Sequence, residues 1–126
     1  MEMTKQTVEI MRVLRELGMH ENLIGFLYTV TAVDAILNSD HVLRTMETYT
    51  AVEEAIGIPA HRIERGIRHS IKTLYVTSDT VRNSPILGTA CRSNKDVPSN
   101  STFLSSVANY IRMRQTEEVI TCDTEA

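Results

Sequence analysis

Hydrophobic positions recur along this chain with a period near 3.6 residues, the period of an α-helix. The first such segment covers residues 4–18, where Thr4 or Thr7 can cap the helix and Gly18 can end it. Its apolar stripe consists of Ile10, Val13, Leu14 and Leu17. We therefore predict an amphipathic first helix with one face in the core.

A second helix is expected to open at Glu21 or Asn22 and to end at the polar break of residues 38–40. Its predicted buried face consists of Leu23, Phe26, Leu27, Val30, Val33 and Leu37. A third pattern runs from about His41 to Ile56, as one helix or two, and ends at Gly57. Its apolar positions are Val42, Leu43, Met46, Tyr49, Val52 and Ile56.

The stretch from Ile58 to Tyr75 divides most sharply into two faces. One narrow arc of the helical projection holds Ile63, Ile67, Ile71 and Leu74. The other side holds His61, Arg62, Arg65, Arg68, His69 and Lys72. Pro59 suits a first helical turn, where its missing N–H is not needed. We predict a helix beginning near Ala60 with a core-facing stripe and a basic face.

The helical signal is weaker after Tyr75. A short helix is expected near residues 80–83, followed by a polar loop over residues 89–101 and a last helix that begins after Ser99 or Ser101. The apolar face of that helix holds Phe103, Leu104, Val107 and Ile111, with Met113 as a further candidate. No strand signal exceeds the helical one, so the predicted fold is all-α, with about six helices around a central helix-turn-helix, like a winged helix without strands.

The end of the chain differs in composition from the rest. Residues 116–126 contain four acidic residues and no Lys or Arg, with little hydrophobic pattern. Such an end is expected to fray. The predicted organisation is a helical domain over residues 1–115 followed by an acidic flexible tail over residues 116–126.

Composition restricts the class of protein. Aromatic residues make up 5% of the chain and Trp is absent, which disfavours single-strand binding by base stacking. We see no secretory signal and no apolar run of about 18 residues, the length needed to span a membrane. Cys91 and Cys122 stand alone and indicate free thiols in a reducing cytoplasm, with a disulfide between them as the less favoured alternative. We therefore expect a cytoplasmic protein.

The charge is distributed unevenly. The formal net charge is −3, yet the stretch from Ile58 to Tyr75 has four Lys or Arg against one Glu, so the remainder carries −6. A charged helix face is often no more than a solvated face. Here the basic face is almost unmixed and lies on an acidic chain, which favours an anionic partner.

The third helix, the turn at Gly57 and the basic helix together have the order of a helix-turn-helix. In this arrangement the second helix enters the major groove of DNA, and its N-terminal side chains reach base edges. Val52 and Ile56 are expected to pack inward from the first helix of the pair, and Ile63 and Ile67 from the second. Amphipathic helix pairs are common, so this pattern alone is moderately specific.

Three blocks of this sequence resemble one known family. HRIERGIRHSI, residues 61–71, resembles the recognition helix of the C-terminal effector domain of stage-zero sporulation protein A, the response regulator of endospore-forming bacteria. LRELGM with GFLY, at residues 14–19 and 25–28, and PSNSTF, at residues 98–103, are similar to two further blocks of that family, in the same order. The resemblance covers about residues 8 to 115. It implies an all-helical DNA-binding domain that binds a short DNA box, with two domains in tandem.

The resemblance places Arg62, Glu64, Arg65, Arg68 and His69 at the DNA surface. The chemistry fits, because Arg can bond guanine O6 and N7 bidentately, Glu can accept from cytosine N4, and Lys or His can meet phosphates. The full set of candidate DNA-binding residues is His61, Arg62, Glu64, Arg65, Arg68, His69, Lys72 and Lys95.

The same resemblance bears on regulation and association. A receiver domain of about 120 residues does not fit beside this domain, so we expect the family's phosphorylation switch to be absent unless the chain is a fragment. Double-stranded DNA is the expected partner. We expect a monomer or weak dimer in solution that loads cooperatively, as a homodimer or tandem pair, on paired sites.

Other chemistry finds little support. The four His residues do not form a zinc spacing with either Cys, and we predict no metal site and no cofactor. Glu53 and Glu54 are adjacent, point apart on a helix and have no nucleophile beside them, so we do not expect an enzyme. The alternative to a DNA-binding regulator is a protein-interaction module that keeps the fold and pairs with another regulator.

Overall fold

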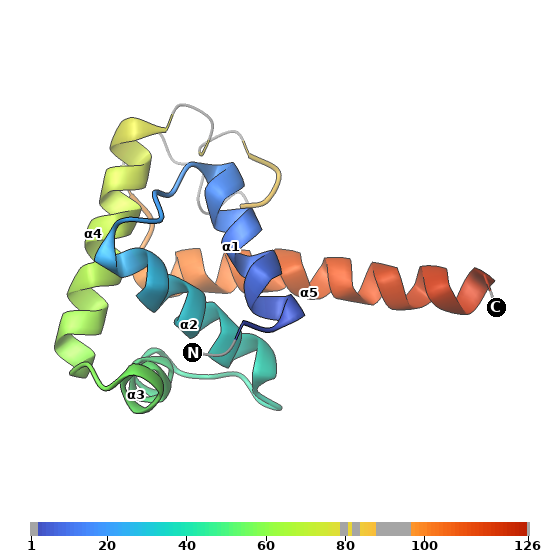
Figure 1. The fold of residues 1–126 in the computed structure, drawn as a ribbon, viewed down its shortest axis with the longest axis horizontal. Helices are drawn as coiled ribbons and strands as arrows, with labels where there is room; N and C mark the ends of the chain where they lie inside the picture. The colour runs from blue at the N-terminus through green and yellow to red at the C-terminus, as the bar shows by residue number, and fades with distance from the viewer. Residues whose placement is uncertain (1–2, 79–80, 82–83, 88–96, 126) are drawn as a thin grey trace.

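A computed structural model describes residues 3–78, 81, 84–87 and 97–125, with the backbone alone for residues 119–125 (Figure 1). Over these residues the chain forms five α-helices and no strand. The all-α prediction is confirmed, whereas the expected count of about six helices is slightly too high. The additional helix, expected near residues 80–83, falls largely outside the described residues.

Helix α1, Lys5–Leu17, begins and ends where its sequence predicts. The Thr4 hydroxyl accepts a hydrogen bond from the Thr7 N–H at 3.1 Å, and the Thr7 hydroxyl oxygen accepts from the Thr4 N–H at 2.8 Å. This reciprocal pair satisfies two N–H groups that the first helical turn leaves without partners. Gly18, with φ of 105°, then ends the helix in a left-handed conformation that suits glycine.

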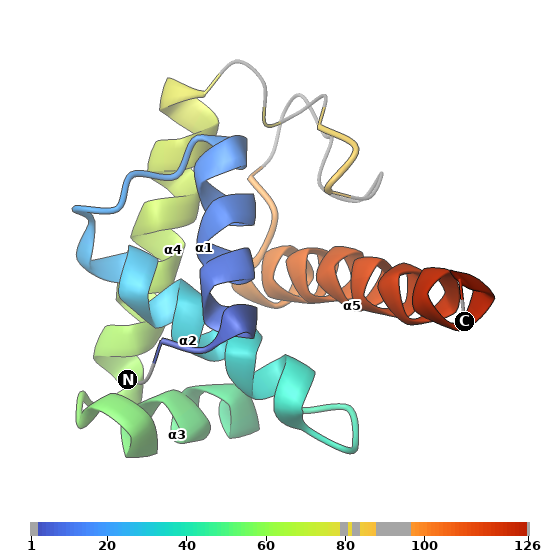
Figure 2. The ribbon, with the colours of Figure 1, turned by 45° about the vertical axis from the view of Figure 1, so that its right-hand side comes forward.

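Helix α2, Ile24–Asn38, is the central helix and packs against each of the other four (Figures 1 and 2). Its fifteen residues include a single charged side chain, Asp34, so it is apolar on nearly every side. A helix of this kind is stable only when it is surrounded. The position of α2 therefore follows from its composition.

Two predictions for α2 are wrong in detail. The helix begins at Ile24 rather than at residue 21 or 22, and Leu27 is 42% exposed although it was assigned to the buried face. Thr29 and Thr31 are buried instead. Their hydroxyls donate to the carbonyl oxygens of Gly25 and Leu27, four residues earlier, at 2.6 and 2.8 Å. Burying a threonine costs little when its hydroxyl has such a partner.

Helix α3, Thr45–Ile56, begins four residues later than the sequence suggested. Val42 is 93% exposed and Met46 is 65% exposed, so neither belongs to the apolar face on which both were placed. The Glu47 carboxylate accepts a hydrogen bond from the Arg44 N–H at 3.1 Å, at the start of the helix. This contact fixes where the first turn of α3 forms.

Helix α5, Asn100–Glu125, begins within the predicted range because Ser99 caps it. The Ser99 hydroxyl accepts from the Thr102 N–H at 3.2 Å. Its apolar face is buried as far as Ile111, whereas Met113 is 65% exposed. Gln115 still donates to the Gln6 side-chain oxygen of α1 at 3.0 Å, and the C-terminal part of α5 beyond it projects from the body of the molecule (Figures 1 and 2). The structure continues this helix through the acidic segment, where the sequence suggested a frayed end. The division into a domain and a separate tail stays a prediction.

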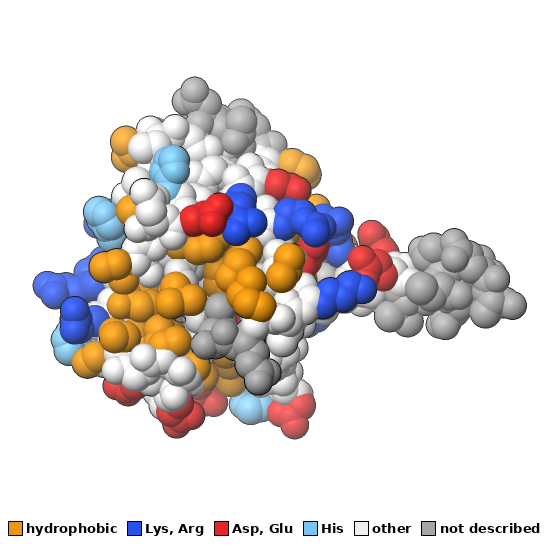
Figure 3. Space-filling view, in the orientation of Figure 1, with side chains coloured by type: hydrophobic (Ala, Val, Ile, Leu, Met, Phe, Trp, Pro, Cys, Tyr) orange, Lys and Arg blue, Asp and Glu red, His pale blue; other side chains and the backbone are white. Residues whose placement is uncertain are grey.

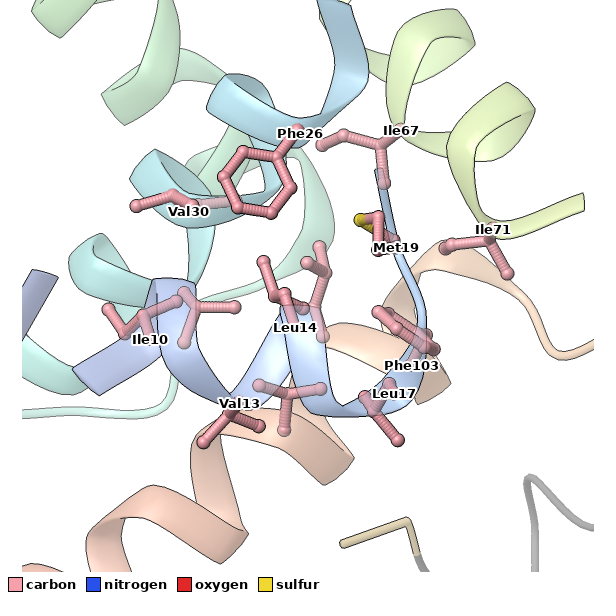
Figure 4. Close-up of a cluster of buried hydrophobic side chains, with 14 of the residues drawn as sticks. Ile10, Val13, Leu14, Leu17, Met19, Phe26, Val30, Ile67, Ile71 and Phe103 are labelled. Carbon is pink, nitrogen blue, oxygen red and sulfur yellow. The ribbon is translucent and has the colours of Figure 1, made fainter. Parts of the chain in front are cut away.

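The core lies where α1, α2, α4 (Ala60–Thr77) and α5 meet (Figure 4). The predicted stripes of α1 and α4 are confirmed, because their apolar side chains are 0–1% exposed. These side chains are Ile10, Val13, Leu14, Leu17, Ile63, Ile67, Ile71 and Leu74. The core thus fixes one face of α4 inward and leaves the other face to solvent.

Candidate nucleic-acid interface

Helices α3 and α4 form the helix-turn-helix that the sequence predicts. Gly57 ends α3 with φ of 73°, and its N–H donates to the Glu53 carbonyl at 2.8 Å. Val52, Ile63 and Ile67 are fully buried, and Ile56 is partly buried against the same core. Pro59 directly precedes α4 instead of lying within its first turn. The turn between the helices is therefore residues 57–59.

Glu53 secures this turn from both its backbone and its side chain. In addition to the carbonyl contact with Gly57, one carboxylate oxygen accepts a hydrogen bond from the Ala60 N–H at 3.3 Å. Ala60 is the first residue of α4, so the carboxylate satisfies a free N–H at the positive end of the helix dipole. The sequence pattern did not predict this contact.

The basic face of α4 lies in solvent. His61, Arg62 and Arg65 are exposed on its first two turns, and Arg68, His69 and Lys72 are exposed on the next two. Lys, Arg and His side chains accordingly line the left edge of the molecule in Figure 3, where α4 lies in Figure 1. Six of the eight candidate residues are thus brought together on one exposed helix face.

Glu64 and Arg68 differ from the others because they form an ion pair with each other. Their side chains are 2.8 Å apart at i and i+4, with 33% and 51% of each exposed. Such a pair offsets one positive charge of the face and restricts the orientation of Arg68. Among the described residues, Arg62 and Arg65 have no acidic side chain at ion-pair distance. Lys95, the last candidate, lies outside the described residues.

Asn100, the first residue of α5, joins the helix-turn-helix to the rest of the domain. Its side-chain N–H groups donate to the Tyr49 hydroxyl of α3 and to the Glu64 carbonyl of α4, both at 3.0 Å. Burial raises the pKa of Tyr49, so this hydroxyl remains neutral at physiological pH. One buried amide thereby sets the positions of both helices.

Replacement of Asn100 by alanine should lower the free energy of unfolding by about 1–2 kcal/mol, since it leaves a buried hydroxyl and a carbonyl without their donor. Asn109→Ala is the matched control, because Asn109 is exposed on the same helix. Urea denaturation of both variants provides the measurement. Equal stabilities would show that the Asn100 contacts contribute nothing.

Two grooves lie beside the basic face. One, of about 410 Å³, separates the C-terminal half of α4, with Arg68 and Lys72, from residues 97–101, which lead into α5. The other, of about 480 Å³, separates Arg62, Arg65 and His69 from the first turns of α2. The basic helix is therefore raised between two hollows, which leaves its side chains accessible to a large partner.

An all-helical domain with a helix-turn-helix and an exposed basic second helix belongs to the class of helix-turn-helix regulatory domains. Residues 10–111 match the family described as Sporulation initiation factor Spo0A C terminal, and the chain belongs to this family. That family is the DNA-binding domain of a sporulation initiation factor, and it is a regulatory family without a catalytic role. The resemblance found from the sequence blocks is thereby confirmed. In the described ranges, the helices are too short or too polar to cross a membrane.

Proposed function

We propose that this domain binds duplex DNA sequence-specifically as a transcriptional regulator of the sporulation type, with α4 as its recognition helix in the major groove. The single observation that carries this proposal is the exposure of Arg62 and Arg65, without acidic partners among the described residues, on the N-terminal turns of the second helix of the helix-turn-helix. Those turns are the ones that meet base edges in this motif.

The proposal assigns different roles along the helix. Arg62 and Arg65 read bases, and the Glu64 carboxylate sets the angle of Arg68 while remaining able to accept from a cytosine amino group. His61, His69 and Lys72 hold phosphates, and Lys95 is a further phosphate contact. Two domains load in tandem on paired sites, whereas the free chain is a monomer or weak dimer.

The first test is a fluorescence anisotropy titration of the chain on labelled duplex DNA at several salt concentrations. With about three to four phosphate contacts, the slope of log K against log salt should be about −3. Selection of bound sites from random duplexes would then give the preferred sequence. Binding that does not respond to salt, or selection that yields no preferred sequence, would contradict the proposal.

A second candidate function is an interaction module that pairs with another regulator. The observation that favours it is the exposed Ile24, which lines the groove beside the basic face, together with the exposed Leu27 one turn further along α2, because duplex DNA requires neither. Binding to a protein partner without measurable binding to duplex DNA would establish this alternative.

A further inference from the structure

The groove between α2 and α4 has one cationic wall and one apolar wall, and DNA reading alone does not explain the apolar wall. One wall is cationic, formed by Arg62, Arg65 and His69 of α4. The other is largely apolar and includes Ile24, which is 72% exposed. Figure 3 shows hydrophobic side chains gathered next to the basic edge of the molecule. Half-apolar, half-cationic grooves suit an acidic helix that also carries apolar residues.

The chain itself contains a helix of this chemistry. After Arg114 the sequence has no Lys or Arg, and residues 116–126 hold Glu117, Glu118, Asp123 and Glu125 around Val119 and Ile120. Glu117 and Glu118 are exposed on α5. Ile111 is the last buried position among the described side chains of α5, and the helix continues for fourteen residues past it, which is roughly 20 Å. Arg114 and Gln115 still contact α1, through the Glu9 carboxylate at 3.5 Å and the Gln6 side-chain oxygen at 3.0 Å. Beyond them the backbone of α5 runs away from the body of the molecule (Figures 1 and 2).

The acidic end of α5 lies far from the α2–α4 groove of its own copy. The C-terminal end of α5 projects from the side of the molecule opposite to α4 in both views (Figures 1 and 2). A helix that leaves the body in this direction points away from the groove of its own copy and toward the groove of a second copy (Figures 1 and 2). The acidic end and the basic groove are complementary in charge, and each carries apolar residues for contact.

From these observations we infer that the acidic end of α5 of one copy docks in the α2–α4 groove of another copy. The carboxylates of the helix end meet Arg62, Arg65 and His69, and its apolar residues meet Ile24. Because this inference rests on the proposed role of α4, it has a regulatory consequence. A docked helix occupies the arginines that read bases, so self-association of the free protein opposes DNA binding.

The association is tested first, by sedimentation equilibrium without DNA, in reductant so that Cys91 and Cys122 cannot crosslink copies. The full chain should self-associate weakly, and less so at high salt. Glu117→Gln with Glu118→Gln should raise the dissociation constant about fivefold, the effect of losing two exposed ion pairs. Ile24→Ser should also raise it. Val42→Ser is the matched control, because Val42 is 93% exposed but lies outside the groove.

The second test asks whether self-association opposes DNA binding. Labelled duplex is titrated with the full chain and with the Glu117→Gln/Glu118→Gln variant. The variant should bind more tightly, and only at protein concentrations where the unmodified chain associates. A chain that stays monomeric, or association that survives both the tail and the Ile24 changes, would overturn the inference. If the tail variant lost self-association but neither protein bound duplex DNA, the proposed function would be refuted. The inference that α5 docks in the groove of a second copy would still stand.

Discussion

Replacement of Gly25 by alanine is expected to lower the free energy of unfolding by about 3 kcal/mol, the upper range for overpacking a close contact. Gly25 lies where α2 crosses α4. An added Cβ would stand 2.0 Å from the Ser70 hydroxyl oxygen and 2.1 Å from the Gly66 carbonyl oxygen. The carbonyl belongs to the helix backbone, so the clash is relieved only if α4 moves away from α2. Urea denaturation gives the free energy directly.

Gly66→Ala is the matched control for this change. Its added Cβ would meet the Tyr28 ring at 2.7 Å, and a side chain can shift where a backbone cannot. Alanine is also favoured over glycine inside a helix by about 1 kcal/mol, which offsets part of the contact. We expect Gly66→Ala to cost less than Gly25→Ala. Similar losses for the two variants would show that the approach of α2 to α4 is not limited by backbone atoms.

Helices α1 and α4 were predictable because each has one face in the core and one face in solvent. The periods in α1 and α4 gave the correct buried stripes, and Thr4 with Gly18 gave the bounds of α1. The central helix was less predictable, since α2 is apolar on most sides and a single stripe does not describe it. Leu27 was placed inside, whereas two threonines are buried through hydrogen bonds that hydropathy does not record.

In the candidate interface, too, the local features were predictable from the sequence and the long-range contacts were not. Exposure of Arg62 and Arg65 followed from their positions opposite the isoleucine stripe, which is a local property of one helix. The contacts that place this helix are not local. Asn100 lies fifty-one residues from Tyr49 in the chain, and no short pattern joins them. The Glu53 carboxylate reaches across the turn and accepts a hydrogen bond from the Ala60 N–H at the start of α4. The sequence pattern does not show that this side chain turns toward the next helix.

The positions of Arg65 and Lys72 along α4 lead to different expected losses on mutation. Arg65 is exposed on the second turn of the helix, where a recognition helix meets base edges. Lys72 lies nearly two turns further on and borders the groove toward α5, where the helix leaves the DNA and passes phosphates. We therefore expect the first side chain to supply discrimination between sequences and the second to supply affinity for any duplex.

Arg65→Ala should weaken binding to the preferred site by about 1–3 kcal/mol and should flatten the difference between preferred and scrambled duplexes. Lys72→Ala should weaken binding to both duplexes alike and reduce the salt slope by about one unit. Each variant serves as the control for the other, since both residues are exposed on the face opposite Ile63, Ile67 and Ile71 and neither change should alter the melting temperature. Anisotropy titrations on the two duplexes, with thermal melts beside them, provide the measurement. If Arg65→Ala kept full discrimination in a folded protein, α4 would not be the reader, and the interaction module would become the better account of this surface.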